Sequence, residues 1–178
     1  MKRLLILRHA KAERAKKDTP EDSDRPLTDR GRKDARAIGH IMIARGYLPD
    51  VVLCSPSKRT RETLELVESE TGSGAKVEVP DKLYLATARQ ILALVRGLPD
   101  HVRRPLIIGH NPGLEECAIS LIDDASYPKL GPRSESLKEK FPTAALAVVD
   151  FRSSKWKDLK PATGTLLDFI TPKDLGRN

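Results

Sequence analysis

Cysteine is scarce in this chain of 178 residues, which contains two, Cys54 and Cys117. Their spacing fits neither a metal-binding motif nor the dense disulfide framework of small secreted domains. Long apolar runs are also missing, since no stretch approaches the ~18 residues that a transmembrane helix needs. The apolar run from Leu4 to Leu7 is too short for the core of a signal peptide. These absences argue against a disulfide scaffold and a membrane protein, and favour a cytoplasmic protein with two free thiols.

Aromatic residues make up only 4% of the chain, and the common cofactor and metal motifs are absent. There is no P-loop, no HExxH pair, no glycine fingerprint of the dinucleotide-binding folds and no CxxC pair. We therefore expect no metal and no cofactor. The small number of aromatic rings also leaves little for stacking on nucleic-acid bases.

Basic residues outnumber acidic ones by 32 to 25, which gives a formal net charge of +7. This surplus favours anionic partners, among them phosphates, acidic protein surfaces and nucleic acid, without choosing between them. The basic stretch AKAERAKK at residues 10–17 keeps a nucleic-acid-binding module open as one hypothesis. A basic run of this kind is more often a solvated loop, and we expect no nucleic-acid partner.

Short apolar runs alternate with helical patterns along the chain. Strands are predicted at residues 4–7, 51–54, 105–109, 145–149 and 165–170. Helices are predicted from Thr28 to Gly46, after Ser55-Pro56, from Thr87 to Gly97 and after Asn111-Pro112, with Ser55 and Asn111 as capping residues. Continuous apolar runs suit strands buried on both faces, so we expect one three-layer α/β/α domain over residues 1–178 with a mostly parallel central sheet. Long polar loops are expected at 10–27 and 123–142.

Polar side chains follow three of the predicted strands. Arg8-His9, Ser55 and His110-Asn111 each come just after the carboxyl end of a buried strand. Ligand sites in open α/β sheets gather at that edge, where helix N-termini offer N–H groups and a partial positive charge that suit a phosphate. One histidine alone is better interpreted as a hydrogen-bonded structural residue. Two at equivalent strand ends, with an arginine beside the first, indicate a functional site.

Arg59 is a further candidate, because it falls in the first turns of the helix predicted after Ser55-Pro56. From there an arginine can reach a phosphate with bidentate geometry. The alternative is a solvated helix charge, which we expect for its neighbours Lys58 and Arg61. His40 and His101 lack the strand-end context, and we expect both to be structural or solvated.

Four segments in order give the chain a resemblance to a known family. The similar segments are Arg8-His9-Ala10, Arg25-Pro26-Leu27-Thr28 with Gly31, Ser55-Pro56 with Arg59 and Thr63, and the run from Ile107 to Pro112. They resemble the two histidine motifs and the two intervening motifs of the histidine phosphatase superfamily, also called the phosphoglycerate mutase-like superfamily. Within it the chain is most similar to the SixA branch, the phosphohistidine phosphatases, through Leu83-Tyr84, the Gly-His-Asn-Pro-Gly run and Thr171-Pro172-Lys173.

The resemblance implies the fold of that superfamily and a phosphatase that forms a phosphohistidine intermediate on His9. It implies that Arg8, Arg59 and His110 surround the oxygens of the transferred phosphoryl group, and we add Arg25, Asn111 and Ser55 as further substrate-binding residues. The chemistry agrees, because phosphoryl transfer depends mainly on positioning and on electrostatic stabilisation of the equatorial oxygens. Histidine can carry the covalent intermediate if its attacking nitrogen is unprotonated, and neighbouring cations disfavour the protonated form. Either ring nitrogen of His9 remains possible at this point.

The chain departs from many members of the superfamily at one catalytic position. These members carry a glutamate general acid shortly after the third strand, where this chain has Tyr84. An alkoxide leaving group needs a proton, whereas imidazole leaves a phosphorus–nitrogen bond more readily. We therefore expect a phosphorylated protein substrate, such as a histidine phosphotransfer domain or a phosphocarrier protein.

The alternative is a phosphomonoesterase that acts on a small molecule. It would need an acid from the first loop, where Asp22, Asp24 and Glu13 are available. We also expect a monomer in which the basic residues Lys11, Lys16 and Lys17 steer an acidic phosphoprotein toward the site.

Overall fold

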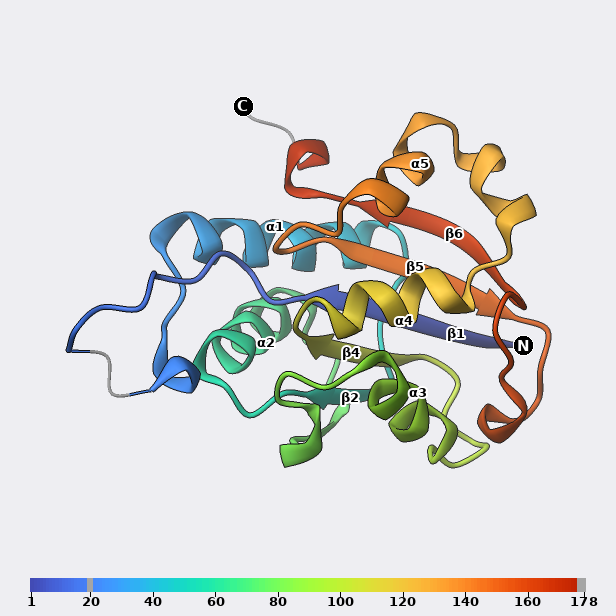
Figure 1. Cartoon of the computed structure of the whole chain (residues 1–178), viewed down its shortest axis with the longest axis horizontal. Coiled ribbons are helices and arrows are strands. Elements are labelled where there is room, and N and C mark those ends of the chain that lie inside the picture. The colour runs from blue at the N-terminus through green and yellow to red at the C-terminus, as the bar shows by residue number, and fades with distance from the viewer. Residues whose placement is uncertain (19–20, 176–178) are drawn as a thin grey trace.

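The computed structural model describes residues 1–18 and 21–175 of the chain (Figure 1). Its centre is a six-stranded sheet in the order β3-β2-β4-β1-β5-β6. The strands are β1 (Lys2–Arg8), β2 (Val51–Cys54), β3 (Lys76–Glu78), β4 (Pro105–Gly109), β5 (Leu146–Phe151) and β6 (Gly164–Ile170). β5 runs antiparallel to both of its neighbours and the other strand pairs are parallel, so the expected α/β fold with a mostly parallel sheet is confirmed.

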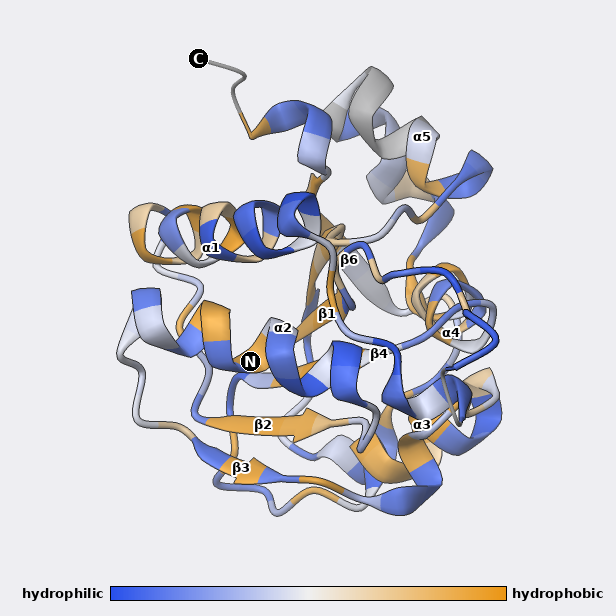
Figure 2. Ribbon diagram, turned by 90° about the vertical axis from the view of Figure 1, so that its left-hand side faces the viewer, coloured by the Kyte–Doolittle hydropathy of each residue, from blue (hydrophilic) through white to orange (hydrophobic). Residues whose placement is uncertain are grey.

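Helices cover both faces of the sheet, as Figure 2 shows in the view turned by 90°. On one face lie α1 (Asp29–Ala44) and α2 (Lys58–Thr71), and on the other lie α3 (Ala88–Arg96) and α4 (Gly113–Leu121). Along β1, Leu5 and Leu7 pack into the core under α1 and α2, whereas Leu4 and Ile6 pack into the core under α3 and α4. Side chains alternate across a strand, so an unbroken apolar run fills both cores at once.

Two of the predicted helix starts are confirmed in detail. The Thr28 hydroxyl accepts a hydrogen bond from the Gly31 N–H at the start of α1. The Thr87 hydroxyl accepts from the Gln90 N–H, and the Gln90 side chain accepts in return from the Thr87 N–H. Each pair satisfies backbone donors that the first helical turn leaves without partners.

The other two helices begin later than predicted. α2 begins at Lys58, and its cap is Ser57 rather than Ser55, because the Ser57 hydroxyl accepts from the Thr60 N–H. α4 begins at Gly113, directly after Pro112, and none of the described side chains caps it. The prediction of Ser55 and Asn111 as caps was therefore wrong. Both side chains make other contacts at the edge of the sheet.

The segment 123–142, predicted as a loop, is largely helical. It forms a 3-10 helix at Asp124–Leu130 and then α5 (Pro132–Glu139). Its polar composition concealed three apolar side chains that are buried in the core beneath it, Tyr127, Leu137 and Phe141. The short edge strand β3 was also missed, because its three residues are all exposed and show no apolar run.

The polar loop at 10–27 is anchored where it passes α1. The carbonyl of Lys11 accepts hydrogen bonds from the backbone N–H of Thr28 at 2.9 Å and from its hydroxyl at 3.2 Å. A Cβ atom on Gly31 would lie 2.1 Å from that same carbonyl oxygen, so only glycine permits this close approach. A 3-10 helix at Asp22–Asp24 lies later in the loop.

Both cysteines are free, as predicted, and both are buried, with Cys54 in one core and Cys117 in the other. Within the described part of the chain, the helices are too short or too polar to cross a lipid bilayer.

Candidate active site

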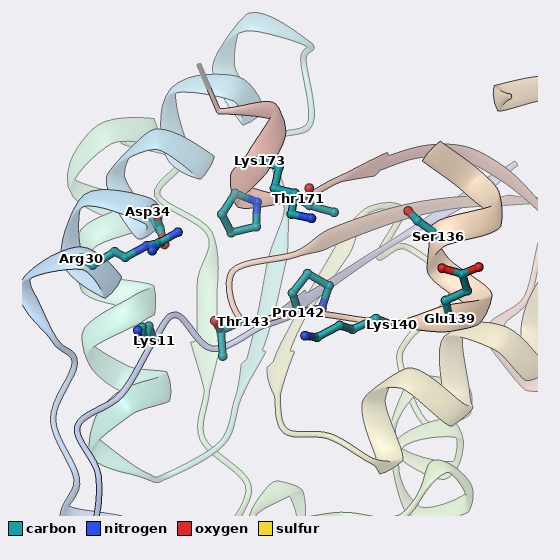
Figure 3. A pocket seen from close by; sticks show the side chains of 11 residues that line it. Lys11, Arg30, Asp34, Ser136, Glu139, Lys140, Pro142, Thr143, Thr171 and Lys173 are labelled. Atoms are coloured by element: carbon teal, nitrogen blue, oxygen red, sulfur yellow. The ribbon is translucent and has the colours of Figure 1, made fainter. Parts of the chain in front are cut away.

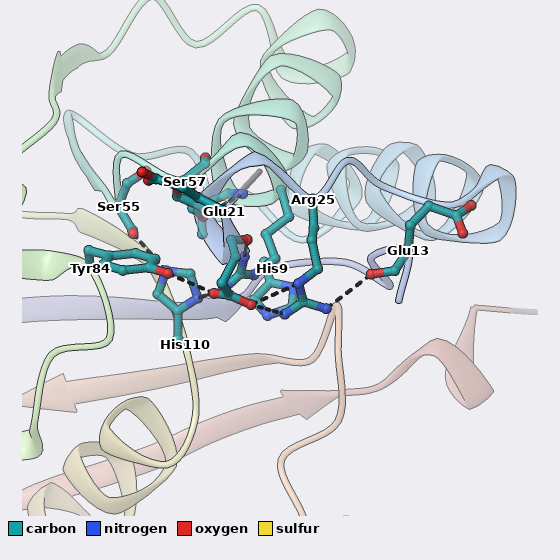
Figure 4. Close-up of polar contacts among 12 residues, drawn as sticks. His9, Glu13, Glu21, Arg25, Ser55, Ser57, Tyr84 and His110 are labelled. Atoms are coloured by element: carbon teal, nitrogen blue, oxygen red, sulfur yellow. Dashed lines mark hydrogen bonds and ion pairs between the residues drawn. The ribbon is translucent and has the colours of Figure 1, made fainter. Parts of the chain in front are cut away.

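Three adjacent strands carry predicted site residues to one edge of the sheet. His9 follows β1, Ser55 follows β2 and His110 follows β4, which lies between the other two strands. The backbone N–H of His9 donates to the Gly109 carbonyl at 3.1 Å, so the two histidine loops are bonded directly. The centroids of the two imidazole rings are 5.3 Å apart (Figure 4). The fold therefore brings together residues that are separated by about a hundred positions in the chain.

The contacts of His9 define which of its nitrogens carries the proton. Nδ1 lies 2.7 Å from the carbonyl oxygen of Ala10, and a carbonyl can only accept. Nδ1 is therefore the protonated nitrogen, and Nε2 keeps its lone pair. Burial lowers the pKa of His9 to about 4, with the charges of Arg59 and Arg8 acting in the same direction and the bond to Ala10 opposing them. At neutral pH the ring is uncharged and Nε2 can act as a nucleophile.

His110 has the opposite tautomer. Its Nδ1 lies 3.2 Å from Nη2 of Arg59, and a guanidinium can only donate, so Nδ1 accepts. Nε2 then carries the proton and donates to the Ser55 hydroxyl at 2.6 Å. Burial is the main cause that lowers the pKa of His110 to about 3, and the nearby charge of Arg59 acts in the same direction. The second histidine is therefore a neutral ring held between an arginine and a serine.

Arg59 is buried, with 2% of its side chain exposed, so it is not a solvated helix charge. Nη1 donates to the backbone carbonyl of Asp22 at 2.8 Å, and Nη2 donates to the Asp22 carboxylate at 3.0 Å. Nε of Arg59 and Nε of Arg8 are buried and have no hydrogen-bond partner among the described residues. A buried donor without an acceptor is unfavourable, so both arginines retain capacity for an anionic ligand.

Arg8 and Asn111 meet at one backbone carbonyl. Nη1 of Arg8 donates to the Phe141 oxygen at 2.9 Å, and Nδ2 of Asn111 donates to the same oxygen at 3.0 Å. Asn111 also donates to the Glu115 carboxylate at 2.7 Å. Burial lowers the pKa of Arg8 from its ordinary value. The segment before β5 thus fixes the ends of β1 and β4 relative to each other.

Asp22 lies at the centre of the cationic cluster, although the sequence suggested it only as a source of protons. Its carboxylate accepts from the Tyr84 hydroxyl at 2.7 Å, from Nη2 of Arg59 at 3.0 Å and from Nε of Arg25 at 2.8 Å. The hydrogen bond from Tyr84 is the main cause that lowers the pKa of Asp22 to about 2, and the charges of Arg59 and Arg25 add to it. Asp22 is therefore ionised at neutral pH and is a poor proton donor. It makes the contacts with Arg59 and Arg25 that a bound oxyanion could make.

Tyr84 lies beside the second histidine, with its ring edge-on to that of His110 at a centroid distance of 5.5 Å. Burial raises the pKa of Tyr84, and its hydrogen bond to Asp22 raises it further. The hydroxyl therefore stays protonated at neutral pH. Glu13 contributes a backbone carbonyl that accepts from Nη1 of Arg25 at 3.0 Å, while Figure 4 shows its carboxylate turned away from His9.

Thr63, the last residue of the Ser-Pro motif, has a supporting position in the site. Its hydroxyl accepts from the Ala10 N–H at 3.0 Å and donates to the Arg59 carbonyl at 2.7 Å. It thereby ties the loop after His9 to the first turn of α2. Its place in the Ser-Pro-x-x-Arg-x-x-x-Thr segment was the available signal.

The cluster as a whole suits a tetrahedral oxyanion, because two arginines with unused donors lie beside the neutral ring of His9. Within residues 1–18 and 21–175, no group of three or more histidine, cysteine or acidic side chains is placed to hold a metal ion.

Sequence comparison places this chain among similar proteins. Residues 4–84 match the sequence model of the histidine phosphatase superfamily (branch 1). An uncharacterized protein of Mycobacterium tuberculosis (strain H37Rv) is 33% identical over 171 residues, which cover 94% of this chain and all of the relative.

Solved structures of two proteins are also similar to this chain. A proposed phosphohistidine phosphatase SixA from Nakamurella multipartitia is 31% identical, with a TM-score of 0.78 and 96% of each chain covered. The protein histidine phosphatase SixA complexed with tungstate is 25% identical, with a TM-score of 0.76, 98% of this chain covered and 99% of that one.

Proposed function

The chain belongs to the histidine phosphatase superfamily and is a phosphatase of the SixA-like branch, and we propose that it hydrolyses phosphohistidine in proteins through a covalent intermediate on His9. The observation that carries the proposal is the unprotonated Nε2 of His9 beside Arg8, Arg59 and His110, together with a tyrosine where a carboxylic acid would serve an ester. A similar structure contains tungstate, a tetrahedral oxyanion like phosphate.

In the first proposed step, Nε2 of His9 attacks the phosphorus atom and the bond to the substrate imidazole breaks. Arg8 and Arg59 hold the phosphoryl oxygens, since charge develops on them during transfer. The leaving imidazole departs as a neutral ring if its other nitrogen already carries a proton, so no strong acid is required. Because its pKa is raised, Tyr84 is a poor acid, which suits an imidazole leaving group better than an alkoxide leaving group.

In the second proposed step, water attacks the phosphorus atom of the phosphorylated His9. The phosphorus–nitrogen bond breaks, inorganic phosphate is released and His9 returns to its neutral form. His110 keeps its place through Ser55 and Arg59 in both steps. Ser55 is thus a positioning residue for His110, and Arg25 and Asn111 complete the set of substrate-binding and positioning residues that we propose.

Asp22 has to give up its contacts with Arg59 when a phosphoryl group enters. The carboxylate is half-exposed and belongs to a loop, so its displacement does not disturb either core. Because Asp22 is ionised, it does not supply the acid that a small phosphoester would need, which favours the phosphohistidine substrate over the esterase alternative. We propose a monomeric enzyme whose partner is a phosphorylated histidine phosphotransfer domain or phosphocarrier protein.

The proposal is tested by trapping the intermediate. The wild type and a His9→Ala variant are mixed briefly with a radiolabelled phosphohistidine protein and quenched in alkali, where phosphohistidine survives. We expect label on the wild-type chain and none on the variant. Hydrolysis by His9→Ala at the wild-type rate would overturn the role of His9. A large preference of the wild type for sugar phosphates or nucleotides over the phosphoprotein would favour the esterase instead.

A further inference from the structure

A second group of cations lies beside the catalytic site. Lys11, Arg30, Lys140 and Lys173 line a cavity of about 560 Å³, which we call the lysine cavity (Figure 3). Figure 3 shows α1 on one side, α5 on the other and the segment after β6 above. The volume falls in the range of ligand-binding clefts, roughly 300–1,000 Å³.

The topology of the sheet brings the lysine cavity to the edge that carries the histidines. Lys11 comes two residues after His9, at the end of β1. Lys140 precedes β5, which is antiparallel to β1 and pairs its first residue, Leu146, with Leu7. Lys173 follows β6, whose last residue pairs with that same Leu146. Three separate segments therefore deliver lysines to the same edge, on the half of the sheet next to the catalytic half.

One backbone segment, residues 141–144, borders both the lysine cavity and the catalytic site. Thr143, which lines the cavity, precedes Ala144, whose N–H donates to the backbone carbonyl of His9 at 3.0 Å. Phe141, just before the lining residue Pro142, offers the carbonyl that Arg8 and Asn111 share. A protein surface that presents a phosphohistidine to His9 therefore lies directly against this cavity.

The charge in the lysine cavity is unbalanced. Four cationic side chains face two carboxylates, Asp34 and Glu139. Nε of Arg30 lies 3.9 Å from the Asp34 carboxylate, at the outer limit of an ion pair. For Lys11, Lys140 and Lys173, the part of the chain that the structure describes provides no ion pair. In Figure 3 the Lys140 side chain points across the cavity toward Thr143 and Lys11, which concentrates positive charge there.

We propose that the lysine cavity binds carboxylate side chains of the phosphoprotein substrate that flank its phosphohistidine. This inference rests on the proposed function and names the surface that selects the protein. Ammonium groups on flexible side chains bind carboxylates in many orientations, which suits a surface that binds more than one partner. The four cations are all exposed, so they suit acidic groups carried on a protein surface better than a free anion, which needs desolvated donors for tight binding.

The test reverses two charges outside the catalytic machinery, Lys140→Glu and Lys173→Glu together. The probe is a histidine phosphotransfer domain of net negative charge, phosphorylated on its histidine. The second substrate is phosphoramidate, which is too small to reach from His9 into the cavity. We expect KM for the domain to rise about tenfold with kcat unchanged, and high salt to remove the difference. Turnover of phosphoramidate should not change.

The matched control reverses the charges of Lys157 and Lys160 by substitution with glutamate. Both residues are exposed and precede β6, at the opposite edge of the sheet. The control variant should leave KM for the domain unchanged. An equal rise in this control, or an equal effect of the Lys140 and Lys173 changes on phosphoramidate, would overturn the proposal.

Binding in a His9→Ala background separates this proposal from the proposed function, because it requires no turnover. Calorimetry should show that the two charge reversals weaken binding of the phosphorylated domain about tenfold. If the wild type fails to hydrolyse the domain but this loss of affinity persists, the catalytic proposal fails and the lysine cavity stands. If inorganic tripolyphosphate binds and the reversals abolish only its binding, the cavity is a small-anion site and the proposal fails.

Discussion

Arg59 and Asp22 form a two-point contact, in which one guanidinium nitrogen donates to the Asp22 backbone carbonyl and the other to its carboxylate. The arginine is buried and belongs to α2, whereas the aspartate is half-exposed and belongs to the loop that precedes α1. A buried guanidinium requires an anionic or polar partner. In the resting protein the chain itself supplies that partner, and an incoming phosphoryl group has to compete with it.

Replacing Asp22 with asparagine should therefore strengthen the binding of simple oxyanions. The amide keeps the size of the side chain but removes the charge that competes for Arg59 and Arg25. We expect the dissociation constant for tungstate or inorganic phosphate to fall about threefold to tenfold, as befits a half-exposed ion pair. The measurement is calorimetric titration. Asp24→Asn, two residues away and exposed, is the matched control and should leave affinity unchanged; weaker binding in Asp22→Asn would contradict the competition.

The activity should survive at mildly acidic pH. The pKa of His9 is lowered from 6.5 to about 4, so the ring stays neutral and nucleophilic down to about that pH. If the pKa of His9 kept its ordinary value of 6.5, activity would instead be lost as the pH fell below that value. We expect kcat/KM for phosphoramidate, corrected for the ionisation of the substrate, to stay level from neutral pH to about pH 5 and to fall near pH 4. A loss of activity centred between pH 6 and 7 would show that His9 is not shielded in this way.

The stability of the fold should follow the same titration. Because the folded pKa of His9 lies below that of the unfolded chain, the unfolded state binds more protons between about pH 6.5 and 4. The free energy of unfolding therefore decreases as pH falls through this window, and a shift of this size corresponds to about 3 kcal/mol at its lower end. Urea unfolding of the wild type and of His9→Gln at several pH values measures this pH dependence. An equal pH slope in both proteins would refute the lowered pKa of His9.

Removing the Ser55 hydroxyl should disturb His110 without unfolding the protein. Ser55→Ala leaves the Nε2–H of a buried histidine without its acceptor, which costs about 1–3 kcal/mol of stability. We expect turnover to fall about tenfold, since an oriented side chain of the site is released. Ser57→Ala is the control, because it removes the cap of α2 at a cost of about 1 kcal/mol while His110 keeps its partner. Equal losses of activity in both variants would mean that Ser55 acts only through stability.

Tyr84→Phe separates substrate classes. It removes the hydrogen bond that is the main cause of the low Asp22 pKa, so that pKa should rise from about 2 toward its ordinary 3.8. Carbon-13 NMR of the aspartate carboxyls, with Asp22→Asn to assign the signal, measures the rise. Hydrolysis of the phosphohistidine protein should change by less than about threefold, because a neutral imidazole leaves without an acid. A loss of a hundredfold or more would instead identify Tyr84 as the proton donor.

Much of the fold could be predicted because the relevant signals are local. The apolar run of β1 fills two cores, so its composition predicts both its burial and its place inside the sheet. The segment 123–142 and β3 could not be predicted in this way. The first buries Tyr127, Leu137 and Phe141 among mostly polar residues, so its helical pattern is weak, and the second is an exposed edge strand.

The catalytic candidates His9 and His110 follow from the sequence itself, because parallel neighbouring strands end at one edge wherever their side chains point. Their roles remain predictions, and their meeting depends on the parallel pairing of β1 with β4, which the tertiary structure supplies. The tertiary structure alone decided the rest: the opposite tautomers of the two rings, Ser55 as the partner of His110 and the cluster of lysines beside the site. It also placed the Asp22 carboxylate against Tyr84, a residue 62 positions away. Such contacts depend on the path of a loop through space, which no local pattern of residues specifies.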